Sequence, residues 1–281
     1  MQIQNKVVVV TGGGNGIGRQ LSLALLERGA RVAAVDINAE ALGETTRLAA
    51  GRAEGLSTHR ADITDPEAVR SLPDEITAKH GRIDILINNA GIIQPFVPFA
   101  EMDYKTIQRV ININLYGPML MIRALLPHLA RQEESGIVNV SSMGGIVPVP
   151  GQSLYGASKA ALKLLSESLR SELADSGINV SVVIPGGVGT NITKNSGVTQ
   201  GVPADTGGSN YKVTTPEEAA KIILRGMEKG KPRILVGKDA RFMDFMSRLA
   251  PVKAGKMIKK MMTSILGELF KDFDPAKTKA F

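Results

Sequence analysis

Short apolar runs alternate with longer segments of helical periodicity along most of the chain. The runs rich in β-branched residues predict strands at Lys6–Thr11, Arg31–Asp36, Gly55–Asp62, Ile83–Gly91, Gly136–Ser142, Ile178–Gly187 and Arg233–Gly237. Helical spacing predicts helices over Ile17–Arg28, Asn38–Ala50, Glu67–His80, Tyr104–Arg131, Ser153–Ser176 and Pro216–Lys229. This regular alternation predicts an α/β fold with right-handed crossovers and a doubly wound parallel sheet.

Two features support this interpretation, whereas the stretch Asn191–Tyr211 and the segment after Gly237 depart from the pattern. The first run is almost continuously apolar, which is typical of a parallel strand buried on both faces. The pair Asp65-Pro66 suits the cap and first turn of the third helix. The stretch Asn191–Tyr211 is polar, rich in glycine and aperiodic, so we expect a lid or a disordered loop there. We therefore expect one domain over 1–237, including a lid at 191–211, followed by a helical extension over 238–281.

Composition limits the class of protein. The chain has 281 residues, 43% apolar and 22% charged, as in globular proteins with a sizeable core. Its sequence shows no apolar run of about 18 residues and no signal-like start, so we expect no transmembrane helix and no export. There is no cysteine, which fits a cytoplasmic chain and excludes thiolate chemistry, and three scattered histidines do not suggest a metal site.

The net charge of +7 is concentrated near the C-terminus. From Arg225 onward there are 14 Lys and Arg against 6 Asp and Glu, a net +8, whereas the preceding residues sum to −1. A nucleic-acid-binding domain would be expected to carry its basic stripe on the folded body, so we expect no nucleic-acid partner.

The glycine-rich stretch TGGGNGIG, Thr11–Gly18, lies between the first predicted strand and its helix. Glycines there allow a sharp turn close to a pyrophosphate, whose charge is met by the N–H groups of the helix start. Asp36 ends the second strand eighteen residues later, where a carboxylate would bind ribose hydroxyls and repel a 2′-phosphate. Ile37 follows it and Gly13 is not basic, so NAD is favoured over NADP. The alternative is that the turn is only a tight connection and Asp36 merely ends a strand.

The spacing TGxxxGxG, taken with SLYGASKAAL, resembles the short-chain dehydrogenase/reductase family, over roughly Lys6 to Gly237. Further matches are ADITD, NNAG, INLYG, GIVNVSS and PGGVGT, in the order the family shows. The resemblance implies catalytic roles for Asn114, Ser142, Tyr155 and Lys159. It implies cofactor contacts from Gly12, Asn15, Gly16, Ile17, Gly18, Asp36, Asp62, Ile63, Asn89, Tyr155, Lys159, Pro185, Val188 and Thr190. Of these, Asp62 would hold the adenine amino group, and PGGVGT would contact the nicotinamide.

Tyr155 and Lys159 are four residues apart at the start of a predicted helix, so they share a face. A phenol ordinarily titrates near 10, and a lysine ammonium together with the nicotinamide is expected to lower that pKa. Tyr155 could then exchange a proton with an alcohol as hydride moves to or from the nicotinamide, while Ser142 bonds the substrate oxygen. The resemblance implies that Asn114 holds a water linking Lys159 to solvent. The alternative is an ordinary amphipathic helix with a snorkelling lysine.

Two segments are expected near the reacting carbon. Gln94–Phe99 and Met143–Gln152 are apolar apart from their glutamines and carry no Arg or Lys. This favours a neutral, hydrophobic secondary alcohol or ketone, although the same residues could simply pack the loops themselves.

The basic C-terminal extension carries an apolar stripe at helical spacing. Its members are Met257, Ile258, Met261, Met262, Ile265, Leu266, Leu269, Phe270 and Phe273, with lysines off the stripe. We expect it to pack on the chain itself or on a second subunit; the alternative is an in-plane helix contacting an anionic membrane.

We therefore predict an NAD-dependent dehydrogenase or ketone reductase, working as a homodimer or homotetramer as the resemblance implies. Two other hypotheses stay open: an NADPH-dependent beta-ketoacyl-thioester reductase, which Asp36 disfavours, and a nucleotide-sensing module without turnover, which would need no proton relay.

Overall fold

The computed structural model describes residues 1–198 and 213–266, with side chains described as far as 260. Its centre is one parallel sheet of seven strands in the order β3-β2-β1-β4-β5-β6-β7. The strands are β1 Val7–Thr11, β2 Arg31–Asp36, β3 Leu56–Arg60, β4 Ile85–Asn88, β5 Ser135–Val140, β6 Ile178–Pro185 and β7 Arg233–Val236. All seven predicted strands are present and the doubly wound fold is confirmed; β4 ends at Asn88, and the rest of the predicted range 83–91 on that side is the exit loop of the strand.

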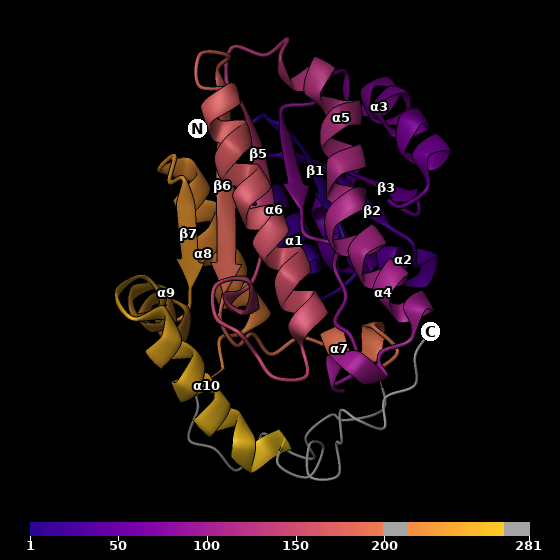
Figure 1. Cartoon of the computed structure of the whole chain (residues 1–281). Coiled ribbons are helices and arrows are strands. Elements are labelled where there is room, and N and C mark those ends of the chain that lie inside the picture. Colours follow the sequence, from indigo (N-terminus) through magenta and orange to yellow (C-terminus); the bar gives the residue numbers. More distant parts are fainter. Residues whose placement is uncertain (199–212, 267–281) are drawn as a thin grey trace.

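Helices cover both faces of this sheet (Figure 1). They are α1 Gly16–Glu27, α2 Ala39–Ala49, α3 Pro66–His80, α4 Tyr104–Ile111, α5 Gly117–Leu129, α6 Ser153–Glu172, α7 Ile192–Asn195, α8 Pro216–Glu228, α9 Lys238–Leu249 and α10 Pro251–Leu266. The predicted cap of α3 is present, since the Asp65 side chain accepts a hydrogen bond from the Glu67 N–H and proline occupies the first turn.

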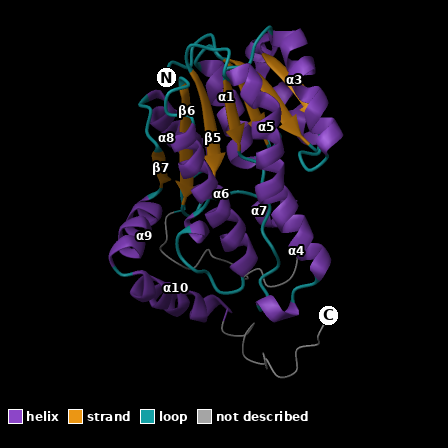
Figure 2. Ribbon diagram, turned by 45° about the horizontal axis from the view of Figure 1, so that its top comes forward, coloured by secondary structure: helices purple, strands orange, loops and turns teal. Residues whose placement is uncertain are grey.

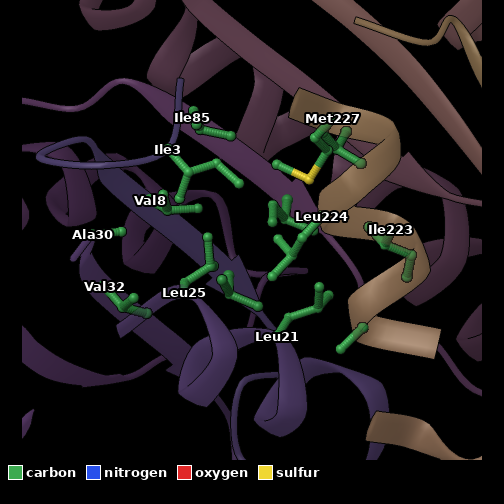
Figure 3. Packing of buried hydrophobic residues seen from close by; sticks show 14 of the residues in the cluster. Ile3, Val8, Leu21, Leu25, Ala30, Val32, Ile85, Ile223, Leu224 and Met227 are labelled. Carbon is green, nitrogen blue, oxygen red and sulfur yellow. The ribbon is translucent and has the colours of Figure 1, made fainter. Parts of the chain in front are cut away.

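Alternation along the strands divides the core into two clusters. On β1, Val8 and Val10 pack with α1 and α8, whereas Val7 and Val9 pack with α3 and α5 on the opposite face. Figure 3 shows the first cluster, where Leu25 approaches the sheet from α1. Both faces of β1 are therefore buried, as its continuous apolar run indicates.

The long helical pattern predicted for 104–131 is interrupted. A π-helical turn, Asn112–Tyr116, joins α4 to α5, so this helix is not regular α-helix throughout. By length and composition the stretch Tyr104–Leu129 could cross a membrane, with a mean hydropathy of 1.2. Its apolar residues Met121, Leu125 and Leu129 are fully buried in the core against the sheet.

The C-terminal extension begins with α9 and α10, which lie beyond the carboxyl ends of the strands (Figures 1 and 2). Of the stripe predicted over 257–273, only Met257 and Ile258 fall among the described side chains. Ile258 is buried and packs, with Met257 beside it, against Val147 and Met243. These two residues therefore pack on the chain itself. The region predicted as a lid is described only as far as Val198, where it contains α7; the remainder of 191–211 lies outside the described residues.

Candidate active site

A cavity of about 810 Å³ lies at the carboxyl ends of the central strands, in the size range of small-molecule sites. Its wall includes most of the residues singled out from the sequence. These are Gly12, Asn15, Gly16, Ile17, Asp36, Asp62, Ile63, Asn89, Ser142, Tyr155, Lys159, Pro185, Val188 and Thr190. Segments far apart in the chain meet here because parallel strands all end on the same edge of the sheet.

The glycine turn between β1 and α1 forms one wall. Gly12 has a φ of +67°, and a Cβ there would lie 2.9 Å from Asn89 Nδ2, so only glycine suits the position. The Asn15 side chain caps α1 by accepting from the Gly16 N–H at 2.7 Å. The Asn89 amide donates to the Thr11 carbonyl at 3.0 Å, so it holds the turn as well as lining the cavity.

Gly18 does not line this cavity, contrary to its expected cofactor contact. A Cβ at Gly18 would collide with the Gly12 carbonyl and with the Asn89 amide. Its role in the structure is to let α1 approach the turn closely, which is a packing function.

Two carboxylates mark the end of the cavity near β2 and β3. Asp36 Oδ2 accepts from the Gly14 N–H and Oδ1 from the Asn38 N–H, both at 3.0 Å, so two backbone donors fix this side chain. Asp62 Oδ1 accepts from the N–H and hydroxyl of Thr64 at 2.8 and 2.7 Å. Asp36 is thereby oriented by backbone donors from the glycine turn and from the start of α2, and Asp62 by the nearby Thr64.

Tyr155 lies in the first turn of α6, and Ser142 follows β5. Their side chains share a hydrogen bond, and Ser142 Oγ also accepts from the Gly144 N–H at 3.1 Å. Burial raises the pKa of the Tyr155 phenol, and the bond to Ser142 opposes that rise. Without cofactor the pKa of Tyr155 is therefore raised rather than lowered, because the effect of burial is larger than that of the bond to Ser142.

Lys159 lies one turn further along α6 and is buried, with 3% of its surface exposed. Its ammonium donates to the Val140 carbonyl at 2.9 Å, at the end of β5. Burial lowers the pKa of Lys159 to about 8, so the amine is mostly charged near neutral pH. Tyr155 and Lys159 both line the cavity, as their spacing predicts, so Lys159 is buried in the site rather than snorkelling to solvent.

Asn114 is fully buried in the π-helical turn and is not on the cavity wall. Its Oδ1 accepts from the Ile92 N–H at 2.9 Å, and its Nδ2 donates to the Ile92 carbonyl at 2.9 Å and to Ser158 Oγ at 3.1 Å. A methyl group on Gly91 would lie 3.0 Å from Lys159 Nζ and 3.2 Å from Asn114 Oδ1. The amine and the amide therefore flank the same narrow space, although protein partners already engage both amide atoms.

The segments expected to contact substrate do not line the described cavity. Gln94 and Gln152 are buried and bond the backbone of the two loops. Met143, Ile146 and Val149 pack with Val147 against the C-terminal helices. The apolar character of Met143–Gln152 is thus explained by packing against the C-terminal helices, whereas Phe99 at the end of the first segment is exposed.

Several cavity residues were not identified from the sequence. Lys105, Gln108, Arg109 and Asn112 line the cavity from α4 and the π-helical turn. Their spacing at i, i+3, i+4 and i+7 marks one polar helix face, which was a usable signal. Arg109 Nη1 also donates to the Ser196 carbonyl at 2.9 Å, which ties α4 to the segment containing α7.

Comparison with known proteins bears on this site. A family model described as short chain dehydrogenase matches residues 6–201. SadH of Mycobacterium tuberculosis, provisionally named an oxidoreductase, is 35% identical over 252 residues, which is 88% of this chain and 91% of that protein.

Solved structures show the same fold. A short-chain dehydrogenase/reductase from Burkholderia phymatum, solved with NAD, superposes with a TM-score of 0.79 at 23% identity, over 89% of this chain and 94% of that one. A short-chain dehydrogenase from Burkholderia cenocepacia, solved with NADP, superposes with a TM-score of 0.77 at 29% identity, over 92% of this chain and 99% of that one.

Proposed function

The chain belongs to the short-chain dehydrogenase/reductase family of enzymes, and on that premise we propose that it is an NAD-dependent oxidoreductase interconverting a hydrophobic secondary alcohol and its ketone. The observation that carries the proposal is the convergence of Tyr155, Ser142 and Lys159 on one cavity that also contains the glycine turn and Asp36.

The cavity residues fit a nicotinamide dinucleotide. Gly12, Gly16 and Ile17 would face the pyrophosphate at the start of α1, where glycine leaves room and helix N–H groups favour negative charge. Asp36 would accept the adenosine ribose hydroxyls, and its charge would repel a 2′-phosphate. The Lys and Arg residues on the described cavity wall come from α4 and α6, not from the segment after β2, which also favours NAD.

When bound, the nicotinamide ring accepts hydride from the carbinol carbon, or returns it to a carbonyl carbon. In oxidation, the Tyr155 phenolate takes the proton from the substrate hydroxyl; in reduction, the Tyr155 phenol gives it back. Ser142 would hold the substrate oxygen through its hydroxyl, which already bonds Tyr155. The Lys159 ammonium on the same helix face would favour the phenolate through its positive charge.

Asn114 would act through its neighbours rather than through the substrate. By fixing Ile92 and lying close to Lys159 across Gly91, it would place the amine and leave space for a connecting water. Since the amide is already engaged, this role is chiefly one of positioning.

The test is a screen of hydrophobic secondary alcohols and ketones with NAD(H) and NADP(H), following absorbance of the reduced ring. We expect turnover by the wild type and a loss of about 10²-fold or more in kcat for Tyr155→Phe, the range that general acid–base catalysis contributes. Unchanged kcat in Tyr155→Phe would overturn the assignment of the base.

Asp36→Ala tests the cofactor choice. Removing the carboxylate takes away one or two hydrogen bonds to the ribose of NAD and the repulsion of the 2′-phosphate of NADP. The ratio of kcat/KM for NAD to kcat/KM for NADP should therefore fall by about tenfold or more. A wild type that already prefers NADP would reverse the proposal, and turnover of thioesters with NADPH would then favour the reductase alternative.

The C-terminal segment supports a further part of the proposal, contact with an anionic lipid surface. Phe242, Phe245 and Leu249 are 51, 60 and 68% exposed on the side of α9 opposite its buried residues. We call this side the α9 outer face. Exposed cations on the same helix are Lys238, Arg241 and Arg248, the last of which also pairs with Asp244, and exposed Lys253 and Lys256 follow on α10. Apolar side chains bordered by positive charge fit the boundary between lipid headgroups and acyl chains.

The charges favour lipid over a second copy of the chain. The two carboxylates of α9 are engaged, Asp239 with the Gly187 N–H and Asp244 with Arg233. A two-fold interface through the α9 outer face would therefore oppose like charges.

Flotation of the full chain with vesicles with and without phosphatidylserine tests this contact. We expect flotation only with the anionic lipid, and its loss in Phe242→Ser/Phe245→Ser but not in the matched control Phe99→Ser, since Phe99 is equally exposed elsewhere. An oligomer that shrinks in the double variant, without flotation of the wild type, would instead assign this face to a second copy.

Family members form oligomers, and we propose a homodimer or homotetramer in the cytoplasm. Exposed Leu164 on α6 and Tyr116 before α5 support assembly through the long helices. Light scattering coupled to size-exclusion chromatography measures the subunit number, and a monomer at working concentration would contradict this part.

A further inference from the structure

The helix that carries Tyr155 and Lys159 begins without a capping side chain of its own. The residue preceding α6 is Gln152, and its side chain makes no capping hydrogen bond. The first N–H groups of a helix have no partner within the helix and need an acceptor from elsewhere. At this helix they lie beside the buried loop after β4.

Gln94 supplies the missing acceptor from about 60 positions earlier in the chain. Its Oε1 accepts from the N–H of Leu154 at 2.9 Å and from the N–H of Tyr155 at 2.8 Å. Its Nε2 donates to the Gly151 carbonyl at 3.0 Å, and the side chain is fully buried. One amide therefore binds the Gly151 carbonyl just before the helix and the N–H groups of Leu154 and Tyr155 in its first turn.

The support beneath Gln94 is fixed in turn. Gln152 Nε2 donates to the Gln94 carbonyl at 2.8 Å, so each glutamine side chain binds the backbone of the loop that carries the other. The neighbouring Ile92 is bound at both its N–H and its carbonyl by Asn114, and the Ile93 N–H donates to Ser196 Oγ at 3.0 Å. The loop after β4 is thus held by several hydrogen bonds, and Gln94 links this loop to the start of α6.

We infer that Gln94 is a positioning residue of the active site, which caps α6 from outside and thereby fixes the Tyr155 phenol against Ser142. This inference rests on the proposed role of Tyr155. Tyr155 is in the first turn, so a helix start that frays displaces its ring directly, while Lys159 one turn later is less affected. Misplacement of a reacting group by about 1 Å can cost about 10²-fold in rate.

The kinetic test compares Gln94→Met, Gln94→Glu and the matched control Gln132→Met. Met has the length of Gln but can neither donate nor accept in this way. A fully buried Glu is favoured in its neutral form, which keeps an acceptor oxygen for both N–H groups and has an O–H for the Gly151 carbonyl. Gln132 bonds a helix carbonyl far from the cavity. We expect Gln94→Met to lower kcat by about 10- to 100-fold with an unchanged Kd for the dinucleotide, Gln94→Glu to recover most of the loss, and Gln132→Met to behave as wild type. Equal kcat in Gln94→Met and Gln132→Met, both folded, would overturn the inference.

A second measurement does not depend on turnover. The chain has four tyrosines, so incorporation of 3-fluorotyrosine gives few ¹⁹F signals, and Tyr155→Phe identifies the one of interest. In Gln94→Met we expect this signal to move or broaden and the pKa of Tyr155 to rise further, because the bond to Ser142 is lost; Gln94→Glu should restore both. An unshifted signal and titration in Gln94→Met refute the positioning role. If instead the wild type turns over no alcohol, the proposed function fails while this spectrum still decides on Gln94.

Should Gln94→Met not fold, Gln94→Glu decides alone. Wild-type kcat and an unmoved ¹⁹F signal in that variant support the capping role, since its neutral carboxyl group keeps the acceptor for the Leu154 and Tyr155 N–H groups. A loss of kcat in Gln94→Glu equal to that of Tyr155→Phe, in a folded protein, overturns it.

Discussion

His80 gives the protein a weakness toward acid that can be measured directly. It ends α3 and is 4% exposed, and its Nε2 is hydrogen-bonded to Ser57 Oγ at 2.8 Å. Burial, followed by the positive charges of Arg31, His59 and Lys79, lowers the pKa of His80 from 6.5 to about 4.

The sign follows from proton uptake. Between pH 4 and 6.5 the unfolded chain binds a proton at His80 and the folded chain does not, so the free energy of unfolding falls as the pH falls. The stability is fully present above 6.5 and is lost on approach to about 4. The difference between the two pKa values corresponds to about 3 kcal/mol.

Urea unfolding across that pH window, for wild type, His80→Gln and the matched control His128→Gln, isolates the effect. Glutamine cannot take up the proton, so His80→Gln should be less stable near neutral pH but lose about 3 kcal/mol less than wild type on acidification. His128→Gln should follow wild type, with carboxylate effects common to all three. Parallel pH profiles for wild type and His80→Gln would refute the reasoning.

Three further outcomes are expected. Gly18→Ala places a methyl group against the backbone of the glycine turn. The free energy of unfolding, measured with urea, should therefore fall by about 1 to 3 kcal/mol, and the Kd for the dinucleotide, measured by fluorescence titration, should rise. Asp84→Ala removes a fully buried carboxylate that pairs with Lys6 and Arg82, and should cost about 3 kcal/mol; an unchanged urea midpoint would contradict this. Asp244→Ala breaks the ion pair between α9 and β7, so amide exchange in α9 should accelerate about tenfold while that of the central strands stays unchanged.

The strands and the shared helix face of Tyr155 and Lys159 were predictable because their signals are local. The buried runs mark β1 and β2, and the boundaries of β2 agree to the residue with those read from the pattern. The spacing of Tyr155 and Lys159 places both on one helix face, which the cavity wall reflects. A period of four residues needs no knowledge of the rest of the chain.

Other features depend on contacts between distant segments. No spacing connects Gln94 with Tyr155, so the glutamine was assigned to a loop near substrate although it caps α6. The direction of the Tyr155 pKa follows from burial, which depends on the packing of neighbouring elements. The exposure of Phe245 likewise depends on which side of α9 packs on the domain, whereas Met257 and Ile258, the described members of the apolar stripe noted in the sequence, lie on α10.

The frame of the active site uses uncharged amides for a physical reason. Asn89 joins the glycine turn to the end of β4, Asn114 fixes the loop after β4, and Gln94 caps α6. Asn114 and Gln94 each donate and accept, which an ionised carboxylate or an ammonium cannot do. A unit charge about 6 Å from a titrating group, at an effective dielectric constant of about 20, would change its ionisation by about 3 kcal/mol. Amides bridge the segments without that penalty, so the ionisation of Tyr155 is left to burial and to its hydroxyl partner Ser142.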